Sequence, residues 1–261
     1  MKDVKAVFFD IDGTLVSFKS HQVPASVRQA LAELKANGVK IFIATGRMLP
    51  MITVVDDIPF DGYVTYNGAY CVNEKREVIY SNPIPQDDLE SLVDYMKTDS
   101  FPVAFMLEDE MVINFVNDKV EEMAHHVNVE MPRIEEPCET IKKKIFQLCL
   151  YVDHDKEQHI MQTVFKHCAS NRWSPIFADV NVTINNKQTG IDRILEYYGI
   201  DLSETMAFGD GGNDIPMLKH VAIGVAMGNA ADEVKESADY VTDSVDDNGI
   251  VNALRHFGLI K

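Results

Sequence analysis

Three short apolar runs lie in the first quarter of the chain, and each ends abruptly at polar residues. They cover residues 4–9, 39–44 and 62–65. Residues 24–37 have helical spacing, with Val27, Leu31 and Leu34 on one face and Gly38 as the stop. Short apolar runs separated by an amphipathic helix are typical of buried parallel strands in βαβ units.

The same pattern returns near the C-terminus. The expected strands are residues 205–208, 221–225 and 240–241, and the expected helices are residues 189–198, 215–220, 231–237 and 249–256. In an open parallel sheet the ligand binds beyond the carboxyl ends of the strands. Asp10, Thr45 and Asp210 all fall at such ends, so the pattern predicts a functional site there.

The middle of the chain has a different pattern. It predicts helices at residues 85–96, 118–127 and 156–168, and strands at residues 103–107, 111–115, 145–152 and 176–184. Hairpins mixed with helices favour an α+β insert between two halves of a parallel domain. We therefore expect an α/β protein with a Rossmann-like, doubly wound parallel sheet formed by residues 1–82 and 185–261, and an insert formed by residues 83–184. Within the insert, Tyr151 and Trp173 are interpreted as core aromatics.

Charge and composition narrow the possible partners. The chain has 261 residues and a formal net charge of −17, with a pI near 4.8. This balance argues against nucleic acid or an anionic membrane as the main partner. No apolar stretch has the length of a membrane span, the N-terminus does not resemble a signal peptide, and the four cysteines form no Cys-x-x-Cys pair. We therefore expect a cytoplasmic protein with reduced thiols; its oligomeric state is left open.

An aspartate pair follows the first apolar run, in Asp10-Ile11-Asp12-Gly13-Thr14. Two carboxylates at a strand end can bind a hard divalent cation or divide the roles of nucleophile and acid–base group. The same string also suits an ordinary turn, because Asp and Gly are common turn residues. An EF-hand calcium loop needs glycine at its sixth position, whereas Gly13 is fourth, so that interpretation fails.

A second carboxylate pair lies in Gly209-Asp210-Gly211-Gly212-Asn213-Asp214. The glycines let the backbone approach a ligand, so Asp210 and Asp214 can face one ion. A helix N-cap would explain Asn213 or Asp214 but not the whole string. The string does not match Gly-x-Gly-x-x-Gly, which argues against dinucleotide binding.

Groups that suit a phosphate stand at two further places. Thr45-Gly46-Arg47 offers a hydroxyl, backbone N–H groups and a planar cation, and Lys187 lies between a strand candidate and a helix. Each has an ordinary explanation as well: a capping Thr beside a surface Arg, and a solvated Lys.

In this order, the strings resemble the haloacid dehalogenase (HAD) superfamily, and within it the Cof-type phosphatases with a large α/β cap. The resemblance covers the whole chain, and Tyr66-Asn67-Gly68-Ala69 is similar to an Asn-Gly-Ala segment close to the site of these relatives. Gln188 departs from the pattern, because many relatives carry Gly directly after the Lys. The resemblance implies that residues 1–82 and 185–261 form the catalytic core and that residues 83–184 form the cap.

The resemblance also implies roles for individual residues. Asp10 would attack phosphorus as the nucleophile, and Asp12 would act as general acid and base. Mg²⁺ would be held by Asp10, the backbone carbonyl of Asp12, Asp210 and Asp214. The phosphate or substrate would be contacted by Thr45, Gly46, Arg47, Asn67, Lys187 and Asn213.

The implied activity is hydrolysis of small phosphorylated metabolites, with sugar phosphates as the first expectation. Cofactor phosphates, such as flavin or pyridoxal phosphate, are a close alternative. A phosphotransferase or mutase stays open, because it would differ in the cap and not in these strings. A signalling receiver is disfavoured, since receivers are about half this length and lack a second acid at the position of Asp12.

Overall fold

The chain divides into two compact units. One is formed by Met1–Ser81 together with Asn186–Lys261, and the other by Asn82–Asn185. The computed structural model describes residues 3–127, 130–172 and 174–261, so Trp173 lies outside the described residues. The sequence pattern predicts an insert that starts and ends one residue inside the second unit.

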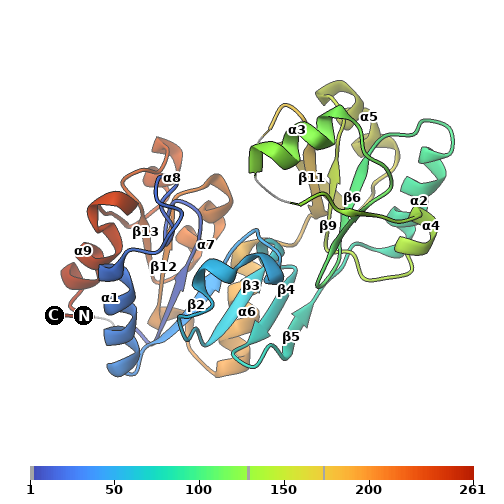
Figure 1. The fold of residues 1–261 in the computed structure, drawn as a ribbon. Coiled ribbons are helices and arrows are strands. Elements are labelled where there is room, and N and C mark those ends of the chain that lie inside the picture. The colour runs from blue at the N-terminus through green and yellow to red at the C-terminus, as the bar shows by residue number, and fades with distance from the viewer. Residues whose placement is uncertain (1–2, 128–129, 173) are drawn as a thin grey trace. The chain divides into compact units, whose positions relative to one another are not determined.

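The first unit, called the core unit below, contains one sheet of eight strands (Figure 1). Its strands are β1 (Ala6–Phe9), β2 (Lys40–Ala44), β3 (Gly62–Thr65), β4 (Tyr70–Asn73), β5 (Val78–Ser81), β12 (Thr205–Gly209), β13 (Ile223–Ala226) and β14 (Tyr240–Val241). Its α-helices are α1 (Ala25–Ala36), α6 (Lys187–Tyr198), α7 (Ile215–His220), α8 (Asp232–Glu236) and α9 (Gly249–His256). Single 3₁₀ turns are η1 (Leu49–Met51), η2 (Thr53–Val55), η3 (Tyr66–Gly68), η4 (Leu202–Glu204), η5 (Gly212–Asp214) and η6 (Val245–Asp247).

The strand order is β14-β13-β12-β1-β2-β3-β4-β5, and all pairs from β14 to β3 are parallel. From β1 the chain moves to one side through β2 and β3, and later to the other side through β12, β13 and β14. The gap between β1 and β12 is therefore the point where the connections diverge, which is where ligands bind in open α/β sheets. The antiparallel extension formed by β4 and β5 was not predicted from the sequence pattern.

Both faces of this sheet are covered, which explains the continuous apolar runs. On one face, Phe8 and Phe42 belong to an apolar cluster with Ile191 and Ile194 of α6 and Leu218 of α7. Helices α1 and α9 lie side by side on the other face (Figure 1). All four residues of β1 are buried, so packing on both faces fixes the strand that ends directly before Asp10.

The second unit, called the insert below, is built on a six-stranded sheet. Its strands are β6 (Val103–Met106), β7 (Met111–Ile113), β8 (Arg133–Ile134), β9 (Gln147–Leu150), β10 (Cys168–Asn171) and β11 (Ala178–Val182), and its helices are α2 (Gln86–Met96), α3 (Asp118–Val127), α4 (Pro137–Thr140) and α5 (His154–Thr163). The strand order is β10-β11-β9-β6-β7-β8, antiparallel except for β7 with β8.

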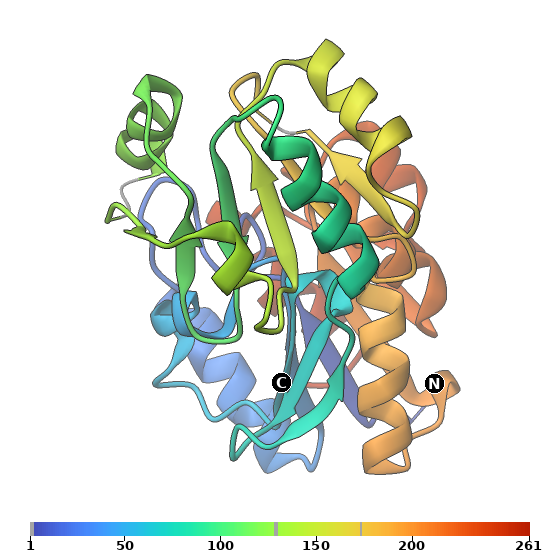
Figure 2. The same ribbon diagram turned by 90° about the vertical axis from the view of Figure 1, so that its right-hand side faces the viewer.

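The insert has an apolar core of its own, between its sheet and the helices α2 and α5. Figure 2 shows α2 crossing in front of the sheet, and Leu92 of α2 and Ile160 of α5 pack there with Phe105 and Leu148 of the strands. The predicted helix at residues 156–168 is wrong at its end, because the chain leaves the helix at Thr163 and residues 168–171 pair with β11. Strand pairing across the sheet overrides the local helical pattern there.

Candidate active site

The carboxyl ends of β1 and β12 bring two of the predicted acids together. Asp10 follows β1, and its backbone N–H donates a hydrogen bond to the carbonyl of Phe208 on β12 (3.0 Å). Asp210 follows β12 directly. Carboxylate oxygens of Asp10, Asp210 and Asp214 all lie within 4.8 Å of one another. Segments two hundred residues apart in the sequence thus meet at the point where the sheet connections diverge.

Lys187 is the cation at the centre of this group. It is the first residue of α6, whose N-cap Asn186 accepts a hydrogen bond from the backbone N–H of Thr189 (3.0 Å). The Lys187 side chain is fully buried, and its ammonium lies 2.5 Å from a carboxylate oxygen of both Asp10 and Asp214. A buried ammonium persists only when paired, so the solvated-lysine interpretation of Lys187 is wrong.

Asp214 is fixed through both of its oxygens. One oxygen accepts hydrogen bonds from the backbone N–H groups of Asp210 and Gly211 (2.9 Å each), and the other faces Lys187. Asp214 is fully buried. These bonds hold the glycine-rich loop in a tight turn and leave Asp214 as a partner of the lysine.

Proton affinities reflect the crowding of these charges. Burial raises the pKa of Asp10 to about 8, against the opposing attraction of Lys187. Burial likewise raises the pKa of Asp210 to about 6, against the hydrogen bond from Thr14. Burial lowers the pKa of Lys187, but Asp10 and Asp214 outweigh it and the net shift is upward. At neutral pH the protein alone therefore keeps a proton on Asp10, whereas Asp210 is mostly ionised.

This arrangement fits a divalent cation. Three carboxylates face a single ammonium, so a cation of charge +2 would offset the excess negative charge and favour ionised Asp10 and Asp210. The atoms that could coordinate the cation are carboxylate and carbonyl oxygens, which are the ligands that hard cations such as Mg²⁺ prefer. Asp10, Asp210 and Asp214 lie close enough to share such a cation, and the backbone carbonyl of Asp12 stays a predicted further ligand.

Asp12 points to a different partner. Its two carboxylate oxygens accept hydrogen bonds from the Arg47 guanidinium at 2.8 and 2.6 Å, in a bidentate pair. Arg47 also donates to the carbonyl of Met51 (2.9 Å). The side chain of Asp12 is 41% exposed, so this acid lies at the open side of the group. In the structure, Arg47 therefore forms an ion pair with Asp12.

The remaining predicted residues lie on three segments that are joined by hydrogen bonds. Thr45 is buried and follows β2, and its carbonyl accepts the backbone N–H of Asn67 (3.0 Å). Asn67 has a left-handed backbone (φ 51°), and its side chain accepts a hydrogen bond from Asn213 (3.0 Å). A side chain at Gly46 would approach the Asn67 amide to 3.2 Å. Strained backbone of this kind is common at functional sites.

Two residues that sequence reasoning missed touch the same group. The buried hydroxyl of Thr14 donates to one oxygen of Asp210 (2.9 Å), and the side-chain amide of Asn229 donates to the other (3.1 Å). Thr14 lies inside a recognised string but was given no role. Asn229 follows β13, and the rule that ligand groups lie beyond parallel strand ends could have found it.

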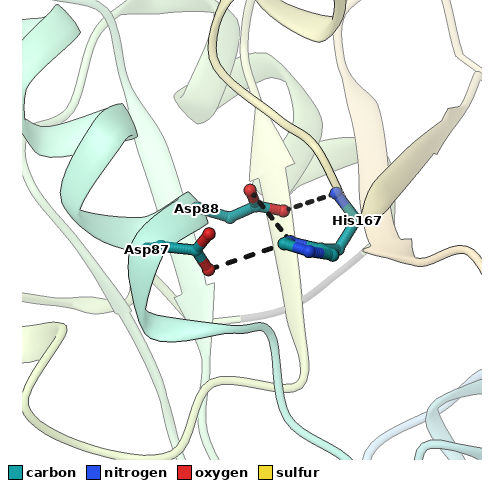
Figure 3. A group of neighbouring side chains, drawn as sticks. All are labelled: Asp87, Asp88 and His167. Atoms are coloured by element: carbon teal, nitrogen blue, oxygen red, sulfur yellow. Dashed lines mark hydrogen bonds and ion pairs between the residues drawn. The ribbon is translucent and has the colours of Figure 1, made fainter.

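A second acidic group lies in the insert. Among the described residues, side chains of Asp87, Asp88 and His167 form the other set that could hold a metal ion. Figure 3 shows them converging, with Asp87 and Asp88 at the start of α2. The oxygens of Asp88 already accept the backbone N–H groups of Lys166 and His167 (2.9 and 3.0 Å). These bonds fasten α2 to the segment before β10, so we assign the group a structural role.

Comparison with known sequences decides the family. Residues 7–254 match the family described as haloacid dehalogenase-like hydrolase. The chain belongs to this family. Among related HAD proteins, "Putative phosphatase YkrA" of Bacillus subtilis (strain 168) is 35% identical over 261 residues, which cover 99% of this chain and all of that protein.

Solved HAD structures agree with this assignment. The phosphatase BT1666 from Bacteroides thetaiotaomicron has a TM-score of 0.91 and 41% identity, over 98% of this chain and 96% of that one. The HAD subclass IIB sugar phosphatase BT4131 has a TM-score of 0.86 and 42% identity, over 98% of this chain and all of that one. The predicted HAD resemblance, the α/β fold class and the enzyme class are confirmed.

Within the described residues, no helix has both the length and the apolarity needed to cross a membrane.

Proposed function

We propose that this HAD enzyme is a Mg²⁺-dependent phosphomonoesterase for small phosphorylated metabolites, sugar phosphates first among them. The observation that carries the proposal is the buried group of Asp10, Lys187 and Asp214 with Asp210 beside it, at the point where the sheet connections diverge. A bound divalent cation would supply charge neutralisation for the phosphoryl group.

In the first step, Asp10 attacks phosphorus, so an aspartyl-phosphate bond forms and the bond to the leaving oxygen breaks. Asp12 gives its proton to that oxygen. In the second step, Asp12 takes a proton from water, the water oxygen attacks phosphorus, and the bond to Asp10 breaks to release inorganic phosphate. Lys187, already hydrogen-bonded to Asp10, would hold a phosphoryl oxygen.

The other residues would bind and position. Thr45, Gly46, Asn67 and Asn213 would line the phosphoryl or leaving-group side, a role supported by the hydrogen bonds that join their segments. Arg47 would pair with Asp12 whenever that carboxylate is ionised, as it is in the bidentate contact, and would add positive charge near the phosphate.

The test of the nucleophile is to trap the intermediate. Asp12→Ala should slow turnover by about 10²–10⁴-fold and accumulate phosphate on Asp10, which mass spectrometry of peptides would locate after reaction with p-nitrophenyl phosphate. Asp10→Asn should abolish turnover and carry no phosphate. Phosphate on any other residue of Asp12→Ala, or appreciable activity of Asp10→Asn, would refute the assigned roles.

The metal is tested by removal and return. Dialysis against EDTA should abolish activity, and Mg²⁺ should restore it, because both ionised Asp10 and the phosphoryl group need charge neutralisation. Full activity in EDTA would refute the metal assignment.

The substrate class is tested by comparing kcat/KM over a panel of phosphorylated metabolites. Sugar phosphates are the first proposal because BT4131, at 42% identity, is named a sugar phosphatase. Cofactor phosphates, such as flavin or pyridoxal phosphate, are the alternative class, and the panel also includes the phosphate named for a relative from Bacillus subtilis at 28% identity, 5-amino-6-(5-phospho-D-ribitylamino)uracil phosphatase YcsE. A tenfold preference for either class would decide between them.

A further inference from the structure

Asn229 connects three segments of the core unit. Its side-chain nitrogen donates to the carbonyl of Gly13 (2.9 Å) and to a carboxylate oxygen of Asp210 (3.1 Å). Its side-chain oxygen accepts the backbone N–H of Val245 (2.9 Å). One exposed side chain thus touches the loop after β1, the acid after β12 and the segment of η6.

Each oxygen of the Asp210 carboxylate accepts a hydrogen bond from a different side chain. The Thr14 hydroxyl donates to one oxygen (2.9 Å), and Asn229 donates to the other. Both donors are neutral, so they fix the plane of the carboxylate without cancelling its charge. A cation could then bind through the remaining lone pairs, since each carboxylate oxygen can accept more than one contact.

Gly13 also packs against the Asp210 carboxylate. Its backbone is left-handed (φ 78°), and a Cβ atom there would lie 2.1 Å from the Asp210 oxygen that Asn229 contacts. The loop after β1 therefore packs directly against Asp210. Asn229 links the two partners of this close contact, because it bonds the carbonyl of Gly13 as well as the carboxylate.

We propose that Asn229 is a positioning residue of the metal site, where its amide holds Asp210 and the loop of Gly13 in the arrangement that a divalent cation requires. The inference rests on the metal role of Asp210 in the proposed function. Groups that orient a ligand carboxylate contribute to metal affinity, and their loss costs about 10–100-fold.

A purely structural role for Asn229 would act through Val245. The same segment is also held by Ser17, whose buried hydroxyl donates to Asp246 (2.6 Å), and by Ser244, which donates to Asp247 (2.6 Å). Ser17→Ala is therefore a matched control, because it removes one hydrogen bond to this segment and does not alter any contact of Asp210. Truncation of Asn229 also removes the partners of the Gly13 carbonyl and of the Val245 N–H, which belong to buried residues, so the stability of each variant has to be measured beside its metal affinity.

The experiment measures the dissociation constant of Mn²⁺ for the full chain without substrate, by the EPR signal of free Mn²⁺. Asn229→Ala should weaken binding by about tenfold, while Ser17→Ala should change it less than twofold. Urea unfolding in EDTA monitors the fold of each variant. Excess Mn²⁺ should restore the activity of Asn229→Ala toward p-nitrophenyl phosphate.

A second variant tests whether Thr14 and Asn229 act on one carboxylate. Thr14→Val removes the other donor, and its effect on Mn²⁺ affinity should not add to that of Asn229→Ala, because residues that share a partner are coupled. Wild-type affinity in Asn229→Ala, or an equal loss in Ser17→Ala, would overturn the role of Asn229 alone. Absence of Mn²⁺ binding by the wild type would instead overturn the metal assignment and this inference with it.

Discussion

At the residue scale, the charge balance of the site depends on Lys187, which is fully buried between Asp10 and Asp214. Lys187→Met keeps a similar length but removes the cation, so two buried carboxylates lose their partner. Breaking a buried ion pair in this way costs about 3–5 kcal/mol. We expect a loss of that size in the free energy of unfolding, measured in urea with EDTA, together with loss of activity.

The matched control combines Lys187→Met with Asp10→Asn and Asp214→Asn. This triple variant has no unpaired buried charge, so it should recover most of the lost stability while remaining inactive. A loss below about 1 kcal/mol in Lys187→Met would mean that the carboxylates are stabilised by something other than the lysine.

Asp210 gives the second residue-scale prediction, in the pH dependence of stability. Its pKa is raised from 3.8 to about 6, so the folded metal-free protein keeps a proton that the unfolded chain releases. Between these pH values Asp210 makes the protein less stable as the pH rises. Asp210→Asn removes this effect, so its stability relative to wild type should increase from pH 4 to pH 7 by on the order of 1–3 kcal/mol.

Urea unfolding in EDTA at several pH values measures the Asp210 effect. Mg²⁺ should stabilise the wild type at pH 7 and leave Asp210→Asn unchanged, because the variant has lost a ligand. A stability difference that shrinks as the pH rises would contradict the assigned pKa direction.

The sequence carried the identities of most site residues but not their partners. Asp10, Asp210 and Thr45 could be predicted because each follows an apolar run that becomes a buried parallel strand. The bidentate contact of Arg47 with Asp12 could not, since it depends on how two loops face each other. Asn229 was missed because it stands alone, outside any recognisable string.

At the element scale, the position of Lys187 depends on how closely α6 approaches the sheet. Gly190 lies in the first turn of α6, where a Cβ atom would come within 2.3 Å of Val64 on β3 and 2.9 Å of the backbone of Gly68. Gly190→Ala should push the start of α6 away from β3. We expect a loss of about 1–3 kcal/mol in unfolding free energy from overpacking, with a fall in kcat larger than the change in KM.

Gln188→Ala is the control for Gly190→Ala, since it alters the same helical turn at a partly exposed position. Gln188→Ala should change the free energy of unfolding by less than about 0.5 kcal/mol. Its kcat should stay within twofold of wild type. Unchanged kcat in Gly190→Ala would show that α6 can shift without moving Lys187.

Elements were predictable where pattern and environment agree. The parallel strands of the core unit read clearly, because burial on both faces leaves continuous apolar runs. The sequence pattern did not predict strands β5 and β10. Strand β5 has one exposed and three partly buried residues, and β10 alternates partly buried with exposed residues and has little apolar character. Such strands form through pairing with a neighbour, which a local pattern does not contain.

At the scale of the whole molecule, the chain places all its predicted site residues in one unit. Residues from Asp10 to Asn67 and from Lys187 to Asp214 belong to the core unit, and none lies between 82 and 185. The insert has a separate sheet and a separate apolar core. Its two ends meet, because the side chain of Asn82 donates to Asn185 (2.8 Å) and that of Asn185 donates to the carbonyl of Asn82 (3.1 Å).

This organisation predicts that residues 82–185 fold by themselves. A unit with its own core and adjoining ends can be excised without breaking its packing. The isolated insert should show a mixed α/β circular dichroism spectrum and unfold cooperatively in urea, with a free energy of about 5–15 kcal/mol. Leu92→Ala, at a fully buried position of its core, should lower that value by about 2–5 kcal/mol. A non-cooperative transition, or no effect of Leu92→Ala, would show that the insert needs the core unit in order to fold.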